Sequence, residues 1–224
     1  MKIIKPSFEI LTVIDGPSIL KSLELAGRTC YKSEDKITDD SAQAFVTKLI
    51  NSGHEAMIEH FSISVKIICD RGVSHEIVRH CLASYAQEST RYCNYSLDKF
   101  GREITVIIPC FWPPALIGSN VNMDYWEEFM IWKNSCLLAE KAYFELLDHG
   151  ATPQQARSVL PNSLKTEIVV TMNLREWRHF FRLRTALTAH PQMREIANPI
   201  LVELQKHIPV IFDDLKDWLK KEIK

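Results

Sequence analysis

The 224-residue sequence lacks any apolar run that approaches the ~18–20 residues of a membrane-spanning helix. Its opening residues, 1–6, also lack the longer apolar segment of a secretory signal peptide. The six cysteines are scattered and include no Cys-x-x-Cys pair, which favours free thiols over a disulfide framework or a zinc ribbon. We therefore expect a cytoplasmic protein with no membrane partner.

Glycine-rich nucleotide motifs are missing as well. The seven glycines form neither Gly-x-Gly-x-x-Gly nor Gly-x-x-x-x-Gly-Lys-Ser/Thr, so a bound dinucleotide would lie outside a Rossmann crevice, and a triphosphatase is not expected. No Gly-x-Ser-x-Gly elbow of a hydrolase occurs. The formal net charge of −1 is unlike that of a basic nucleic-acid-binding domain, so no nucleic-acid partner is expected.

What is present is the composition of a globular protein, with 46% hydrophobic and 25% charged residues. No linker or repeat interrupts the chain, and we predict one domain over residues 1–224. Period-two and helical patterns predict strands over 8–14, 61–67, 103–108 and 165–172, and helices over 18–29, 39–51, 72–80, 122–148, 173–185, after 152, from 191 (kinked or split at Pro199) and from 212. Because strands and helices mix without βαβ alternation, the predicted fold is α+β, broadly α/β, with a central, mostly antiparallel sheet and flanking helices.

A polar segment between residues 79 and 92 concentrates groups that bind anions. It contains arginines, a histidine, hydroxyl side chains, Gln87 and Glu88, and it has no aliphatic core pattern after residue 83. Arginine forks match phosphate oxygens, and a glutamine amide can read the edge of a uracil ring. The segment thus favours a site for a phosphate and a pyrimidine. The alternative from composition is a polar connection between a helix and a surface loop.

The helix predicted over 173–185 carries a second candidate. Arg184 lies seven residues after Trp177 and therefore returns to the apolar side of the helix. A guanidinium directed toward the core needs an anion or several acceptors, because an unpaired buried charge is costly. Arg184 is therefore a candidate for contacting an anionic ligand, with an internal salt bridge as the alternative.

Other basic and imidazole groups are less specific. Arg175, Arg178 and Arg182 form a stripe on a neighbouring face of the same helix, for which a solvated face is the alternative. His54 and His60 flank two glutamates but lie six residues apart, whereas His-Glu-x-x-His places its histidines four apart. We therefore expect no metal site.

Several motifs in order resemble the flavin-dependent thymidylate synthases. Arg79-His80 followed by Ser89 is similar to the family signature Arg-His-Arg-x7-Ser, and the likeness continues to Tyr92. The resemblance extends over residues 8–210 and includes 53–55, 59–60, 156–161, Asn173 with Arg175, 181–185 and 190–196.

This resemblance implies an enzyme that methylates dUMP to dTMP with FAD, methylenetetrahydrofolate as carbon donor and NADPH as reductant. It also implies a homotetramer whose active sites form between subunits. By the same resemblance, the residues that contact FAD are His54, Arg79, His80, Cys81, Gln87, Asn173, Arg175 and His179. Those around dUMP are Glu76, Arg79, Gln87, Glu88, Ser89, Thr90, Arg91, Arg157 and Arg184. Arg184 matches the arginine that favours ionisation at uracil N3, so it is the predicted catalytic residue.

Two positions depart from the family pattern. Cys81 stands in place of the signature's second arginine, and Ala56 stands where a hydroxyl residue often contacts FAD. Loss of one charged hydrogen bond weakens binding by roughly 1.5–3 kcal/mol. These departures keep two alternatives open: a related hydroxymethylase acting on dUMP or dCMP, and a flavin- or nucleotide-binding protein without catalysis.

Overall fold

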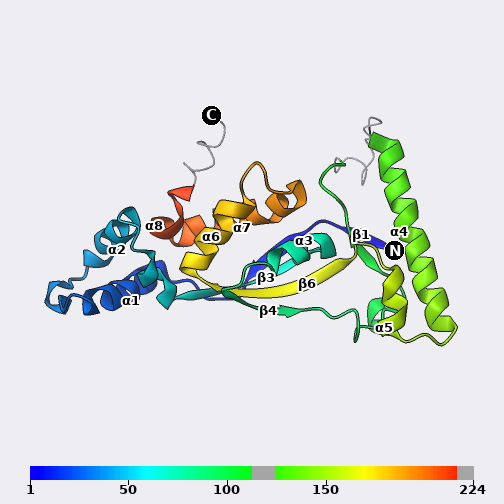
Figure 1. Cartoon of the computed structure of the whole chain (residues 1–224), viewed down its shortest axis with the longest axis horizontal. Helices are drawn as coiled ribbons and strands as arrows, with labels where there is room; N and C mark the ends of the chain where they lie inside the picture. The colour runs from blue at the N-terminus through cyan, green and yellow to red at the C-terminus, as the bar shows by residue number, and fades with distance from the viewer. Residues whose placement is uncertain (113–124, 216–224) are drawn as a thin grey trace. The chain divides into compact units, whose positions relative to one another are not determined.

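The computed structural model describes residues 1–112 and 125–215. Helices and strands alternate irregularly along the chain (Figure 1). With the 3-10 helices written η, the elements are β1 (Lys2–Ile4), β2 (Ser7–Ile10), α1 (Gly16–Thr29), η1 (Glu34–Lys36), α2 (Ser41–Asn51), η2 (Glu55–His60), β3 (Ser62–Asp70), α3 (Arg71–Ile77), β4 (Ala83–Gln87), η3 (Asp98–Phe100), β5 (Thr105–Ile107), α4 (Trp126–Asp148), α5 (Pro153–Ala156), η6 (Arg157–Val159), β6 (Lys165–Asn173), α6 (Leu174–Arg184), α7 (Pro191–His207) and α8 (Pro209–Phe212).

The strands of the described residues form two sheets. One is the parallel pair β1–β5, and the other has the order β2-β3-β6-β4. Beside β3 and β6, the amide of Leu174 donates to the carbonyl of Phe61, and the amide of Arg71 donates to the carbonyl of Asn162. Residue numbers thus rise along β3 as they fall along β6, so these two central strands are antiparallel. The predicted α+β fold with an antiparallel sheet and flanking helices is confirmed.

The chain divides into two compact units. The first comprises Met1–Ser7, Ile67–Val78 and Ala86–Ile168, and the second comprises Phe8–Lys66, Arg79–Tyr85 and Val169 onward. The strands β3, β4 and β6 contribute residues to both units. That the whole chain acts as one domain stays a prediction.

The first unit has its own apolar core. Tyr95, Ile104, Val106, Tyr143 and Leu164 are buried together there. Tyr143 comes from α4, a helix that also packs against α5 and η6. This core supports the segment after β4, where many of the predicted substrate residues lie.

The second unit is built around α6. In Figure 1, α1 and α2 lie side by side, and the two helices pack against each other. Trp177 of α6 is fully buried, stacks on Phe181, and donates its indole N–H to the carbonyl of Ile63 at 3.0 Å. Helix α7 packs on α6 as well. The position of α6 is therefore fixed by aromatic packing and by a buried hydrogen bond to β3.

Two details of local structure differ from what the sequence predicted. Within the polar segment at 79–92, where no strand was predicted, residues 83–87 form β4. The helix from Pro191, predicted to be kinked or split at Pro199, is not split, because one helix runs from Pro191 to His207. Pro199 is exposed, whereas Ile196 and Ile200 beside it are buried, so packing on both sides outweighs the one lost backbone hydrogen bond.

Other boundaries differ by a few residues, as expected for element ends. Strand β2, which corresponds to the strand predicted over 8–14, ends at Ile10, and helix α3 ends at Ile77, both earlier than predicted. The predicted helix start at 122–124 and most of the predicted tail helix, 216–224, lie outside the described residues. Within the described parts, no helix is both long enough and apolar enough to cross a membrane.

Candidate active site

Helix α6 begins at a fixed point because Asn173 ends strand β6 and caps the helix. The Asn173 side-chain oxygen accepts a hydrogen bond from the amide of Glu176 at 2.8 Å. Leu174, Trp177 and Phe181 bury the apolar face that was predicted from their spacing. The polar side chains of α6 therefore leave the helix in defined directions.

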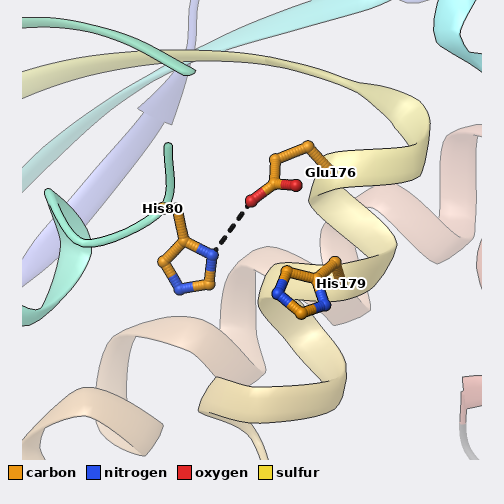
Figure 2. A group of neighbouring side chains, drawn as sticks. All are labelled: His80, Glu176 and His179. Carbon is orange, nitrogen blue, oxygen red and sulfur yellow. Dashed lines mark hydrogen bonds and ion pairs between the residues drawn. The ribbon is translucent and has the colours of Figure 1, made fainter. Parts of the chain in front are cut away.

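One set of these side chains surrounds His80. His80 Nδ1 lies 3.1 Å from a carboxylate oxygen of Glu176, and Figure 2 shows both pointing toward each other, with His179 alongside. Arg184 donates its Nε–H to His80 Nε2 at 3.1 Å. The Tyr85 hydroxyl donates to the backbone carbonyl of His80 at 2.7 Å, which fixes residue 80 itself.

The contacts assign the protonation state of His80. An arginine can only donate, so Nε2 of His80 must be the lone-pair nitrogen, and Nδ1 carries the hydrogen that Glu176 accepts. Burial lowers the pKa of His80, and this outweighs the opposing effect of Glu176; Arg184 lowers the pKa further. His80 is therefore neutral near pH 7. Burial also raises the pKa of Tyr85 to about 12, with help from Glu176, so its hydroxyl stays a donor.

The other set of α6 side chains forms an ion-pair and hydrogen-bond network with η2 and with residues 211–214. Arg178 contacts Glu55 at 3.1 Å and both carboxylate oxygens of Asp214 at 2.7 Å, and it also donates to the Ile211 carbonyl. Arg182 contacts Glu55 at 2.7 Å. Burial would raise the pKa of Glu55, but Arg182 and Arg178 hold it below its usual value.

The alternative of a solvated stripe therefore does not hold for Arg178, which is only 1% exposed. Arg175 does lie at the surface, where it pairs with Glu59 at 2.5 Å. His54, the residue before η2, is exposed. Arg79 and Cys81 are exposed beside the buried His80.

The first unit holds most of the predicted substrate residues. The Gln87 amide donates to Ser74 Oγ at 2.9 Å and to Thr166 Oγ1 at 3.2 Å. The guanidinium of Arg157, an exposed residue, donates to the hydroxyl of the buried Thr90 at 3.4 Å. The hydrogen bond to Thr90 brings Arg157, which lies 67 residues later in the sequence, to the segment after β4.

Glu88 is held by two partners within that unit. It accepts from Lys165 at 2.9 Å and from the Tyr95 hydroxyl at 3.1 Å. Arg91 is exposed and lies over the Tyr92 ring. Ser89 and Glu76 are half-buried, and the Ser89 hydroxyl accepts from the Arg91 amide. The structure therefore gathers Glu88, Ser89 and Thr90 with Arg157 on one unit.

The structure brings His80, His179, Arg184 and Asn173 together in the other unit. Sequence analysis missed Glu176, which touches His80 and is bound by the Asn173 cap. The sequence did contain a local indication of Glu176. An acidic residue three positions after an N-cap is favoured at a helix start, and its side chain points back toward the residues before the helix. The roles assigned to the site residues remain predictions.

Comparisons with known proteins agree with this fold. A UMP/dUMP methylase, PolB from Streptomyces cacaoi, crystallised with 5-Br dUMP, matches with a TM-score of 0.76 over 97% of each chain at 23% identity. The fold of this chain is thus one that a pyrimidine-nucleotide methylase uses.

Relatives found by sequence share a higher identity with this chain than PolB does. The flavin-dependent thymidylate synthase of Geobacter sulfurreducens is 34% identical over 200 residues, which cover 86% of this chain and 80% of that protein. The enzyme of the same name from Pyrococcus abyssi is 36% identical over 176 residues, covering 78% and 67%. The family described as thymidylate synthase complementing protein matches residues 12–210. The chain belongs to this family and is an enzyme of the flavin-dependent thymidylate synthase kind.

Proposed function

We propose that this enzyme methylates dUMP to dTMP, with methylenetetrahydrofolate as the carbon donor and NADPH-reduced FAD as the hydride source. The observation that carries the proposal is the half-buried Arg184, held by His80 inside the stretch that matches the family. The relatives named flavin-dependent thymidylate synthase support it, as does the fold shared with a UMP/dUMP methylase.

The chemistry of the second unit's side chains fits a flavin dinucleotide. Arg79 and Arg175 are exposed guanidiniums, which suit a diphosphate, and His54 and His179 are exposed imidazoles, which suit the edge or face of a flat ring. Bound there, FAD would supply the hydride that completes the methyl group. The protein's own part is to bind and orient both reactants and to polarise the pyrimidine.

Arg184 is the proposed polarising group. A guanidinium that stays charged and is partly withdrawn from water stabilises negative charge on an adjacent ring more strongly than a solvated one does. Placed at the pyrimidine of dUMP, it would favour ionisation at N3 and so activate the ring. In the first unit, Arg157, Arg91 and Ser89 offer the guanidinium and hydroxyl donors that suit a phosphate.

A cysteine nucleophile is not part of the proposal. Burial raises the pKa of the Cys69 thiol, and it raises the pKa of Cys136 to about 11, so neither is a thiolate at neutral pH. Cys81 is exposed, and its thiol contacts the Arg79 carbonyl at 3.7 Å. None of the six cysteines, all of which lie in the described parts of the chain, forms a disulfide, in keeping with a cytoplasmic location.

The test is a product assay on the purified protein with dUMP, methylenetetrahydrofolate, FAD and NADPH. We expect dTMP, identified by mass, and no product when FAD is withheld from flavin-free protein. A hydroxymethylated nucleotide carries one oxygen more than dTMP and would replace the proposal by that of a hydroxymethylase. Flavin-loaded protein that binds dUMP but yields no product would identify a non-catalytic relative.

We also propose that the enzyme is a homotetramer. On α4, Ile131 and Leu138 are seven residues apart and therefore on one face, and they are 70% and 68% exposed. Exposed apolar stripes of this kind mark interaction surfaces. Light scattering should give the mass of four chains, and an Ile131→Lys, Leu138→Lys variant should shift to smaller species. A wild-type protein that stays a single chain at working concentrations would refute the assembly.

A further inference from the structure

We propose that Glu176 is a positioning residue that acts through His80 to aim the guanidinium of Arg184. This role rests on the proposed function, because Arg184 matters only if the enzyme polarises a pyrimidine. It adds to that function a residue outside the predicted site. The sequence order hides the relationship, since His80 lies 96 residues before Glu176.

The first step of the argument is hydrogen-bond direction. Arg184 needs an acceptor at His80 Nε2, which lies 3.1 Å from its Nε. A neutral imidazole offers that acceptor only in the Nδ1–H form, and the group bound to one ring nitrogen determines which form is present. Glu176 accepts at Nδ1, 3.1 Å away, and so selects this form. Without Glu176, Nε2 can carry the hydrogen, and the Arg184 contact is lost.

The second step is the environment of the carboxylate. Glu176 is 7% exposed and His80 is 4% exposed, so water does not compete for this hydrogen bond. The Glu176 amide is bound by the Asn173 cap, and a negative charge in the first turn of α6 is favoured by the helix dipole. The charged and titratable groups around His80 are Glu176, Arg184 and His179 of α6, with Tyr85 of β4.

A metal ion is the main competing interpretation. Ligand atoms of His80, Glu176 and His179 lie within 4.8 Å of one another, and Figure 2 shows the three side chains as neighbours. Both ring nitrogens of His80 are already used, however, one as donor to Glu176 and one as acceptor from Arg184. A cation there would have to displace a neighbouring guanidinium and a proton. The geometry therefore favours the hydrogen-bonded chain over a metal centre.

The direct test is independent of catalysis. Histidine ring nitrogens labelled with ¹⁵N report their protonation by NMR, and a His80→Gln variant identifies the His80 signals among the eight histidines. We expect wild-type His80 to be neutral at pH 7.5 with hydrogen on Nδ1, and Glu176→Ala to shift hydrogen to Nε2. Hydrogen on Nε2 in the wild-type protein would overturn the proposal. So would a stoichiometric Zn²⁺ site in the wild type that is lost in His179→Ala.

The kinetic test separates positioning from folding. Glu176→Ala should lower kcat by up to roughly 10²-fold, the cost of a displaced catalytic group, while flavin content and melting temperature stay near wild type. Glu176→Gln keeps an acceptor for Nδ1–H and should recover most of kcat. Glu203→Gln makes the same chemical change in an exposed ion pair of α7 and serves as the control.

The outcomes distinguish the two proposals. A wild-type enzyme that makes no dTMP refutes the proposed function, whereas the NMR result still decides the role of Glu176. If Glu176→Ala folds and keeps full kcat, Glu176 does not position Arg184. If Glu176→Ala fails to fold, the wild-type His80 signal alone is decisive.

Discussion

The buried Arg178 allows a sharp test of the ion-pair network. Arg178→Met keeps an apolar side chain of similar length but removes the charge. The change leaves Glu55, which is 15% exposed, with Arg182 as its remaining partner, and it takes a donor from the Ile211 carbonyl. Breaking a buried pair by removing one partner costs about 3–5 kcal/mol. Asp214 is 47% exposed, so water screens its interaction with Arg178. We therefore expect a loss of unfolding free energy at the lower end of this range, about 3 kcal/mol.

This loss translates into a measurable change in melting temperature. For a chain of this size, 1 kcal/mol shifts Tm by roughly 2–4 °C, so Arg178→Met should melt about 6–12 °C below wild type. Circular dichroism on flavin-loaded protein at pH 7 measures the shift. Asp214→Asn, which removes only the screened partner, should cost less than about 1 kcal/mol. Lys206→Met, in the exposed pair with Glu203, is the surface control and should leave Tm nearly unchanged.

The acid side of the stability curve gives an independent check. The pKa of Glu55 is held below its usual value, so its stabilising effect is present above about pH 4.5 and is lost as the pH falls through the folded value. Arg178→Met should therefore show a smaller decrease in unfolding free energy with acid than wild type. If Arg178→Met has the same Tm as Lys206→Met, and its unfolding free energy depends on acid pH as that of wild type does, the reasoning from burial is wrong.

Further predictions concern the site. Arg184→Ala should fold normally and lower kcat by roughly 10²–10³-fold in the product assay; wild-type turnover would remove Arg184 from the mechanism. Cys81→Ser should keep most activity, and a folded but inactive variant would indicate a missed thiol step. Cys81→Arg should purify with more flavin than wild type, by an amount that shrinks with salt, whereas weaker FAD binding would show that the site has repacked around the thiol. Because burial lowers the pKa of His80, the unfolded chain binds a proton more readily, so unfolding free energy should fall as the pH drops below about 6.5, and His80→Asn should lack that slope.

Much of the fold was predictable because its signals are local. The alternation that predicted a strand at 61–67 corresponds to β3, whose Ile63, Val65 and Ile67 are fully buried. Asn173 was predicted to start α6, and its side chain does cap that helix. In both cases the residue pattern and the backbone geometry depend on neighbours in sequence.

What the sequence could not give depends on contacts between distant segments. Strand β4 has polar residues, and its hydrogen bonds to β6 rather than its composition make it a strand. The Arg178 network includes Glu55 and Asp214, which lie 123 and 36 residues away. The local signal at Glu176 marks only a helix start, and its contact with His80, in a different segment, is not visible in the sequence.

Trp177 gives the enzyme a built-in optical probe. Its indole ring is fully buried, and its N–H donates a hydrogen bond to the Ile63 carbonyl of β3. In the sequence it stands between Glu176 and Arg178. Trp112 and Trp132 are only partly buried, and Trp126 is exposed, so their emission comes from wetter surroundings. Among the tryptophans of the described residues, Trp177 thus has the driest surroundings, and its short-wavelength emission should report whether α6 is seated on β3. The same cuvette can then follow this fluorescence and the visible absorption of a bound flavin.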